Sequence, residues 1–154
     1  EFKADFQLKL IGAVSQEVLD TISEFRLESY VNNLGYVSHK EAVLHQRSSQ
    51  VLLLIEINSE ETKSIIPGKL FEYMVSERPI LALGPENSDF ESIIKATNTG
   101  VFHQYDEYDE LKQTILDFYE KYKLNELQVH AVGLQQYSRK NLTKQLAEVI
   151  NAKR

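Results

Sequence analysis

The chain has 154 residues, enough for one domain with a buried core, and its 42% hydrophobic and 26% charged residues are typical of a globular protein. A formal net charge of −6 without any basic run argues against nucleic acid as the main partner, and the lack of cysteine excludes disulfides and thiolate chemistry. The longest apolar runs are strand-sized, too short to span a membrane. We therefore expect a single cytoplasmic domain, residues 1–154, that binds any phosphate through backbone amides and one or two cations.

The apolar pattern alternates between strand-like and helix-like segments along the chain. The strand-like segments are 6–14, 30–37, 51–57, 79–83 and 100–105. The helix-like segments are 16–25, 38–47, 68–76, a short one after Ser88 or Asp89, 109–122 and 137–152. Ser38 and Glu41 form a capping box that opens the second helix. Segment 51–57 is apolar on both faces, as a central parallel strand would be. This order predicts an α/β fold: a Rossmann-like open, mainly parallel sheet with helices on both faces.

The segment PGKLFEY, residues 67–73, is typical of a loop that turns into a helix at an anion site. Pro67 fixes φ and Gly68 tolerates positive φ, so the chain can turn sharply there. The first turn of a helix presents unpaired N–H groups on which a phosphate can dock, and Lys69 adds a positive charge. One turn further on, Glu72 can accept hydrogen bonds from sugar hydroxyls. The pattern indicates a diphosphate on the amides and a ribose diol on Glu72. The alternative is an ordinary junction in which Glu72 complements the helix dipole.

The predicted topology limits where a ligand can bind. In open α/β sheets, ligands lie outside the carboxyl ends of the strands. The loops expected there are 12–15, 36–39, 58–68 and 84–88. The third loop leads into PGKLFEY, which favours the functional interpretation of that segment. His39, at the end of a predicted strand, either contacts ligand or is a plain surface residue.

Other groups of reactive side chains carry weaker signals. His39 and His45 are six positions apart and fall on different faces of a helix, which disfavours a zinc pair. The acidic residues at 106, 107, 109 and 110 precede a helix, and we expect them to complement its dipole rather than to bind metal. No glycine-rich dinucleotide motif, Walker loop or nucleophile elbow occurs. We predict no metal site and no cofactor, and we assign no catalytic residue.

Five sequence blocks, in this order, resemble the donor-binding half of family 4 glycosyltransferases with the GT-B fold. They are LIG (10–12), GYVSHKEA (35–42), PGKLFEYM (67–74), RPILA (78–82) and YSRKNLT (137–143). The resemblance covers nearly the whole chain. It implies most of the carboxyl-terminal lobe of an enzyme that moves a sugar from a nucleotide-diphosphate sugar to an acceptor, in bacterial surface polysaccharide synthesis.

The resemblance also implies roles for individual residues. Glu72 corresponds to the second glutamate of the family's E-x7-E motif, which binds the ribose hydroxyls. Backbone amides around Lys69 and Leu70 would hold the diphosphate, and the loop containing Tyr36 would border the base. Ser64 departs from the pattern, because many members have a sugar-contacting glutamate there. Together with the loop positions, the predicted nucleotide-sugar-binding residues are Gly12, Tyr36, Val37, His39, Ser64, Gly68, Lys69, Leu70 and Glu72.

A second departure concerns what the family pattern places before residue 1. The lobe usually opens with a strand, a glycine-rich loop and a helix, preceded by an acceptor-binding lobe. The resemblance therefore implies a fragment that is inactive by itself, because transfer needs two substrates held together. The absent strand would lie between segments 6–14 and 51–57, so we expect these to pair directly or to be bridged in a strand-paired or swapped homodimer. The missing lobe would be the protein partner and would carry any peripheral membrane contact.

Two other functions remain open. One is a sugar-nucleotide epimerase with the GT-B fold, although such an enzyme would be expected to place more acids and histidines in its strand-end loops. The other is a noncatalytic α/β module, such as a receiver-like regulator, although the first strand ends in Gly12-Ala13-Val14 and lacks an acidic pair. Glycosyl transfer is the preferred hypothesis.

Overall fold

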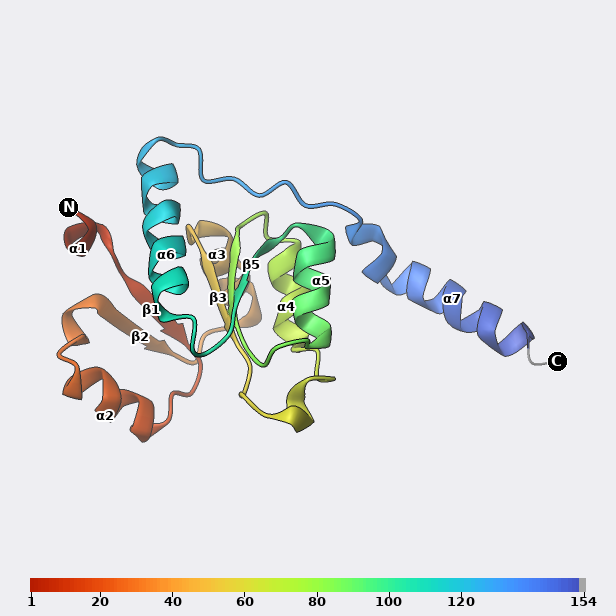
Figure 1. Cartoon of the computed structure of the whole chain (residues 1–154), viewed down its shortest axis with the longest axis horizontal. Helices are drawn as coiled ribbons and strands as arrows, with labels where there is room; N and C mark the ends of the chain where they lie inside the picture. Colours follow the sequence, from red (N-terminus) through yellow and green to blue (C-terminus); the bar gives the residue numbers. More distant parts are fainter. Residues whose placement is uncertain (153–154) are drawn as a thin grey trace. The chain divides into compact units, whose positions relative to one another are not determined.

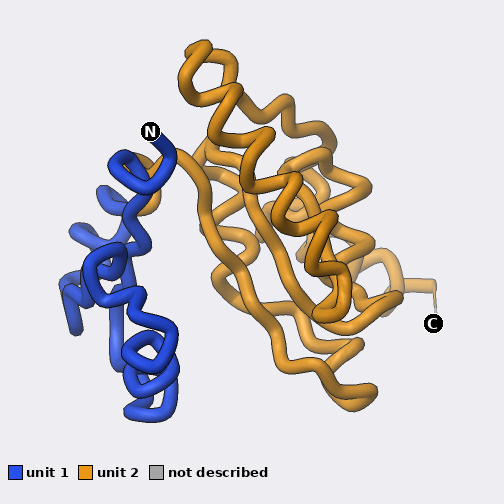
Figure 2. Tube along the Cα trace, turned by 60° about the vertical axis from the view of Figure 1, so that its left-hand side comes forward, with its two compact units in different colours: residues 1–45 blue, residues 46–154 orange. Residues whose placement is uncertain are grey.

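The computed structural model describes residues 1–152, which belong to two compact units, residues 1–45 and the residues from 46 onward (Figure 1, Figure 2). The unit boundary falls inside one helix, α3, His39–Ser48. Each unit has its own parallel sheet with helices beside it. The α/β fold class predicted from the sequence is therefore confirmed, consistent with a Rossmann-like open fold. The single domain over residues 1–154 stays a prediction.

The first unit is a strand–helix–strand arrangement that follows a short helix. Its elements are α1 (Phe2–Asp5), β1 (Leu8–Ile11), α2 (Gln16–Glu24), the 3₁₀ turn η1 (Glu28–Tyr30) and β2 (Val31–Gly35). β1 and β2 pair in parallel, with Leu8 opposite Val31. The predicted segments 6–14, 16–25 and 30–37 are confirmed, with shorter strands. Helix α1 has four residues, too few to show a helical period in the sequence.

Both longer helices that begin in this unit have side-chain caps at their amino ends. Ser15 Oγ accepts the N–H of Val18 at the start of α2. At the start of α3, the backbone N–H and the hydroxyl of Ser38 donate to Glu41 Oε2 at 2.9 and 2.7 Å, and the Glu41 N–H donates to Ser38 Oγ. This is the predicted capping box. The hydrogen bonds from Ser38 lower the pKa of the Glu41 carboxyl, because they stabilise its charged form.

The second unit has a three-stranded parallel sheet in the order β3-β4-β5. β3 spans Leu52–Ile55, β4 spans Ile80–Leu83 and β5 spans Gly100–His103. Its helices are α4 (Gly68–Met74), α5 (Asp89–Thr97), α6 (Tyr108–Lys123) and α7 (Arg139–Ala152), with 3₁₀ turns η2 (Glu60–Thr62) and η3 (Leu134–Tyr137). Each strand and helix predicted between residues 51 and 152 is present with slightly different ends.

The core of this unit lies between one sheet face and helices α4 and α5. It consists of Leu54, Leu70, Met74, Ile80, Ala82, Phe90, Ile93 and Ile94. On the other face, α6 is joined to β5 by a hydrogen bond between His103 and Thr114. Helices thus lie on both faces of this sheet, and the carboxyl ends of its three strands lie at one edge (Figure 1).

The prediction of a central, doubly buried strand at 51–57 is wrong. β4 is the central strand, because it pairs with both β3 and β5, whereas β3 pairs with β4 alone among the described strands. In β3 buried residues alternate with exposed ones: Leu52 and Leu54 are 5% exposed, while Leu53 and Ile55 are 37% and 56% exposed. The continuous apolar run 51–57 therefore belongs to an edge strand, and the side chains on one face of this strand are exposed.

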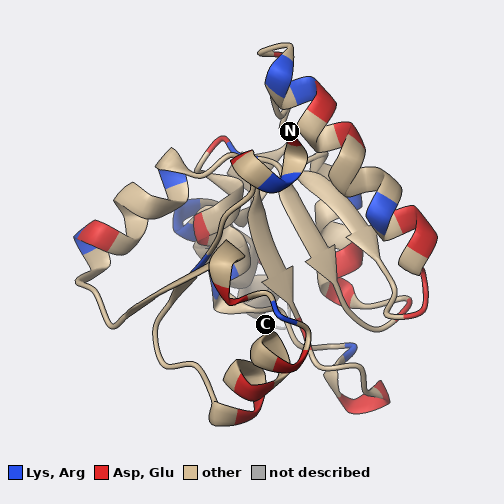
Figure 3. Cartoon of the chain, turned by 90° about the vertical axis from the view of Figure 1, so that its left-hand side faces the viewer, with Lys and Arg blue, Asp and Glu red and all other residues tan. Residues whose placement is uncertain are grey.

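β1 and β3 belong to different sheets, so the direct pairing that the sequence allowed is not formed. Bridging of these strands by a second chain stays a prediction. Helix α7 has no buried residue, and its apolar positions Leu142, Leu146, Val149 and Ile150 are all exposed. Within residues 1–152, no helix has both the length and the apolar character that crossing a bilayer requires. Along the described helices, acidic and basic residues are interspersed (Figure 3).

Candidate functional site

A polar pocket of about 490 Å³ lies at the carboxyl edge of the β3-β4-β5 sheet. The loops that follow the three strands all contribute to its walls. Its lining residues are Asn58, Ser59, Glu60, Lys63, Gly84, Pro85, Glu86, Gln104, Tyr105, Asp106 and Tyr108. This is the position at which open parallel sheets bind ligands, because successive loops diverge from neighbouring strand ends. We take this pocket as the candidate functional site.

The loops around the pocket are tied to one another by hydrogen bonds. The Tyr105 hydroxyl donates to the carbonyl of Glu56 at 2.7 Å, which connects the loop after β5 to the end of β3. The Asp89 N–H donates to the Lys63 carbonyl at 2.8 Å, which connects the start of α5 to the loop after β3. Partial burial, with a smaller effect of the Glu56 charge, raises the pKa of Tyr105, so its phenol stays protonated as a donor.

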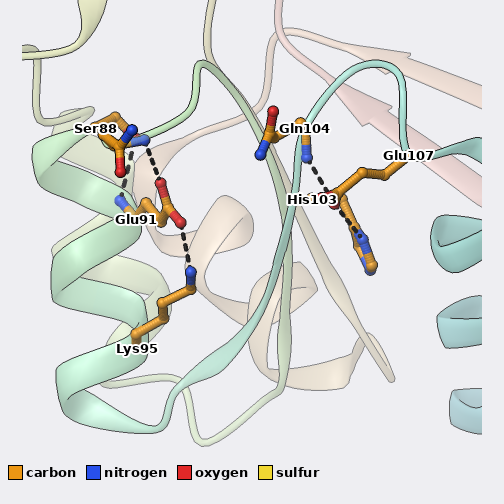
Figure 4. Close-up of polar contacts among 7 residues, drawn as sticks. Ser88, Glu91, Lys95, His103, Gln104 and Glu107 are labelled. Carbon is orange, nitrogen blue, oxygen red and sulfur yellow. Dashed lines mark hydrogen bonds and ion pairs between the residues drawn. The ribbon is translucent and has the colours of Figure 1, made fainter.

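Glu91 holds the loop after β4. Its Oε2 accepts the N–H of Asn87 at 2.7 Å, and its Oε1 pairs with Lys95 Nζ at 2.5 Å (Figure 4). Ser88, fully buried, caps α5 by accepting the Glu91 N–H. The hydrogen bond from Lys95 to Glu91 raises the pKa of Lys95, because it stabilises the ammonium form. These contacts fix the pocket wall that contains Gly84, Pro85 and Glu86.

His103 and Glu107 hold the loop after β5 in a similar way. Glu107 Oε2 accepts the N–H of Gln104 at 3.1 Å and lies 3.1 Å from His103 Nδ1 (Figure 4). His103 Nε2 lies 2.9 Å from Thr114 Oγ1 on α6. Because a carboxylate can only accept, Nδ1 carries a hydrogen. His103 is 6% exposed, so this chain of groups is a structural support and not an open site.

The chemistry of the pocket favours a neutral, hydroxyl-bearing ligand. Three carboxylates, Glu60, Glu86 and Asp106, face one ammonium, Lys63, which is itself paired with Glu60 at 2.7 Å. An excess of negative charge disfavours a phosphate inside the pocket. Carboxylates and carboxamides accept hydrogen bonds from hydroxyls, and tyrosine rings provide flat apolar surface. Within residues 1–152, no group of three or more His, Asp or Glu side chains is arranged to hold a metal ion.

The predicted residues of the PGKLFEY segment lie at the start of α4. The predicted change from loop to helix is present, with Gly68 as the first helical residue, although Gly68 does not use the positive φ that glycine allows. Leu70 is fully buried, and its N–H, one of the predicted diphosphate donors, already donates to the Pro67 carbonyl at 2.9 Å. Ser64 is exposed in the loop before the helix.

Glu72 is engaged on several sides. Its Oε2 accepts from Lys69 Nζ at 3.0 Å and from Gln46 Nε2 at 3.2 Å. The Lys69–Glu72 pair is an i,i+3 contact with both side chains partly exposed, so it stabilises the helix only modestly. Burial raises the pKa of the neighbouring Tyr73. The structure thus pairs Lys69 with Glu72 across one helical turn, and their predicted roles in binding a nucleotide stay a prediction.

The remaining predicted residues belong to the first unit. Gly12 adopts a φ of +115°, and its N–H donates to the Gly35 carbonyl at 2.8 Å, so the carboxyl ends of β1 and β2 meet. Tyr36, which is 86% exposed, and Val37 follow in the loop after β2. His39 is the first residue of α3. As a set, the nine predicted residues stay a prediction, divided between two units.

The sequence predicted that two of the three pocket loops, 58–68 and 84–88, lie at the ligand-binding edge, but none of the nine predicted binding residues lines the pocket, and the loop after β5 was not among the predicted loops. Tyr105 and Tyr108 stand where a predicted strand ends, and Asp106 was assigned to the dipole of the following helix. A usable signal was present: polar and aromatic residues follow each of the three predicted strands 51–57, 79–83 and 100–105, and parallel strands bring such positions to one edge.

Comparisons with known proteins leave the family open. No protein-family model matches this chain, and no curated protein and no solved structure matches it at a significant level.

Proposed function

We propose that this chain is the donor-binding lobe of a glycosyltransferase that uses a nucleotide-diphosphate sugar. The observation that carries the proposal is the pocket at the carboxyl edge of the β3-β4-β5 sheet, lined by carboxylates, carboxamides and tyrosines. A neutral sugar is the ligand class that this combination suits. The motif PGKLFEY, on the loop and helix that follow β3, supports the same assignment through its resemblance to family 4 glycosyltransferases.

We assign the neutral sugar and the charged diphosphate of the donor to different places on the chain. The sugar occupies the pocket, where three carboxylates accept its hydroxyls. The diphosphate lies instead near the start of α4, where Lys69 is the nearest cation in the sequence. The ribose diol binds Glu72, and it must compete with the contacts from Lys69 and Gln46. This competition keeps the affinity of the chain for a nucleoside diphosphate weak.

The part of transfer assigned to this chain is to hold the donor. Transfer also requires an acceptor positioned against the anomeric carbon of the sugar, and positioning of two reactants is a large share of the rate enhancement in such reactions. We assign that task to a second lobe. The same proposal includes the contacts that the resemblance implies, namely a strand-paired or swapped homodimer of this chain and a peripheral membrane contact through the second lobe.

Titration calorimetry with ADP, GDP and UDP in parallel tests the proposal. One of the three is expected to bind, and Glu72→Ala should weaken its binding about tenfold, because a charge-assisted hydrogen bond contributes about 1.5–3 kcal/mol. Glu72→Gln keeps one acceptor oxygen and should lose less. Glu110→Ala, on the exposed side of α6, is the matched control for removal of one carboxylate. Equal affinities of wild type, Glu72→Ala and Glu110→Ala would contradict the assignment.

A further inference from the structure

A second pocket in this unit, of about 360 Å³, is lined by Arg47, Val75, Ser76, Glu77 and Arg78. These residues come from the last turn of α3, the end of α4 and the approach to β4. Because β4 begins at Ile80, the pocket lies on the amino-terminal side of this strand, whereas the candidate donor pocket follows its carboxyl end. We call it the arginine pocket. Its walls are almost entirely polar, since Val75 is the one apolar residue among them.

Arg78 is held in place by the backbone of the other arginine. Its Nε donates to the carbonyl of Arg47 at 2.8 Å, a contact between residues 31 positions apart. A guanidinium has five N–H donors, so this bond leaves the terminal nitrogens of Arg78 for another acceptor. A planar guanidinium fixed at Nε is suited to bidentate binding of an oxyanion.

The two arginines have no carboxylate partner among the residues that the structure describes. Glu77 is the one acidic residue in the lining, and it forms no ion pair with either of them in this part of the chain. The arginine pocket therefore has an excess of one positive charge, in a protein whose formal net charge is −6. Two arginines line one pocket, so a doubly charged anion bound there would balance their like charges.

We propose that the arginine pocket binds a small phosphate dianion, either inorganic phosphate or a phosphomonoester. Phosphate has enough oxygens to bind both guanidinium groups at once. Its two negative charges are close to the two positive charges of the arginines, which Glu77 reduces to a net excess of one. The scarcity of apolar lining disfavours a ligand with a large aromatic or aliphatic part. This site is separate from the donor site and does not depend on the proposed glycosyl transfer.

The alternative role of these arginines is to stabilise the ends of helices. Arg47 lies in the last turn of α3 and Arg78 shortly after α4, and cations are favourable at helix carboxyl termini. This role predicts an effect of each arginine on stability and none on anion binding. The two roles can therefore be separated by measuring both properties on the same variants.

The test is a titration of the ¹⁵N-labelled chain with inorganic phosphate, and separately with glycerol 3-phosphate, followed by amide chemical shifts. We expect saturable shifts at residues 75–78. Arg47→Gln and Arg78→Gln should each weaken binding about tenfold, the loss typical of a charge-assisted hydrogen bond. Arg139→Gln, at the start of α7, is the matched control and should bind as wild type does. If glycerol 3-phosphate binds and inorganic phosphate does not, the ligand is a phosphomonoester; the reverse result identifies free phosphate.

Arg78→Gln also removes the hydrogen bond to the Arg47 carbonyl and can lower stability, so Arg47→Gln is the decisive variant. Unchanged phosphate affinity in Arg47→Gln would overturn the proposal and leave the arginines as helix-end cations. Shifts confined to residues 68–70 would also overturn it, since they would place the phosphate at the start of α4. Linear, unsaturated shifts at 75–78, equal in wild type and Arg47→Gln, would also overturn it, because they would show no specific binding in the arginine pocket.

Discussion

Gly100 is the position in the second unit where one added methyl group should do most damage. It begins β5, opposite Ile80 on β4. A Cβ at Gly100 would collide with the backbone carbonyl oxygen of Ile80 and would lie 2.7 Å from its carbonyl carbon and 2.8 Å from its Cβ, whereas ordinary contacts begin at 3.4 Å. Ile80 is fully buried in the core and Thr99 is 1% exposed, so neither strand can move away freely.

The cost of Gly100→Ala follows from these contacts. Overpacking of a buried site costs about 1–3 kcal/mol. Separation of β4 from β5 would also weaken the hydrogen bond from Ile80 N–H to the Thr99 carbonyl, now 3.0 Å, at a net cost of about 1 kcal/mol. We therefore expect the free energy of unfolding to fall by about 2–4 kcal/mol.

Urea denaturation followed by circular dichroism measures this change. Gly68→Ala is the matched control, because a Cβ there meets no atom within 4 Å and the residue is the first of α4. Alanine is the better helix former by about 1 kcal/mol, so this variant should be as stable as wild type or more so. A Gly100→Ala protein within about 0.5 kcal/mol of wild type, the range of surface substitutions, would refute the close approach of β4 and β5 at this point.

Two further predictions concern the first unit and the activity. Ser38→Ala should raise the pKa of Glu41 toward the ordinary value of a glutamate, because the hydrogen bonds from Ser38 lower it in the folded state. Because the pKa is lower in the folded than in the unfolded state, this carboxylate stabilises the fold above its unfolded pKa, and that stabilisation is lost as pH falls through the folded pKa. Acid destabilisation should therefore weaken in this variant. Carboxyl ¹³C NMR measures the pKa of Glu41 in both proteins, and identical values would contradict the capping box. In a donor-consumption assay, the 154-residue chain alone should transfer no sugar, because transfer needs an acceptor held against the donor and the acceptor is assigned to a second lobe. Turnover that Glu72→Ala abolishes would instead identify a complete enzyme.

Much of the local structure was readable from the sequence, because its causes are local. The capping box of Ser38 and Glu41, the buried cap at Ser88 and the helical apolar periods depend on residues within one or two turns. The alternation of strands and helices likewise predicted parallel sheets. For the site, local reasoning identified Lys69 and Glu72 as neighbours, since residues three apart share a helix face.

The place of a strand within its sheet, and contacts between distant segments, could not be predicted from local sequence. The run 51–57 has the same apolar residues whether a strand lies on both sides of it or on one, and the structure makes β3 an edge strand. The strand order indicates the edge at which the candidate pocket lies, but the pocket joins loops almost 50 residues apart, such as those connected by Tyr105 and Glu56, so no local pattern shows which side chains line it. The arginine pocket has the same origin, because Arg47 and Arg78 meet only once α3 ends beside the start of β4. Contacts between distant segments are set by packing, and packing is a property of the folded chain as a whole.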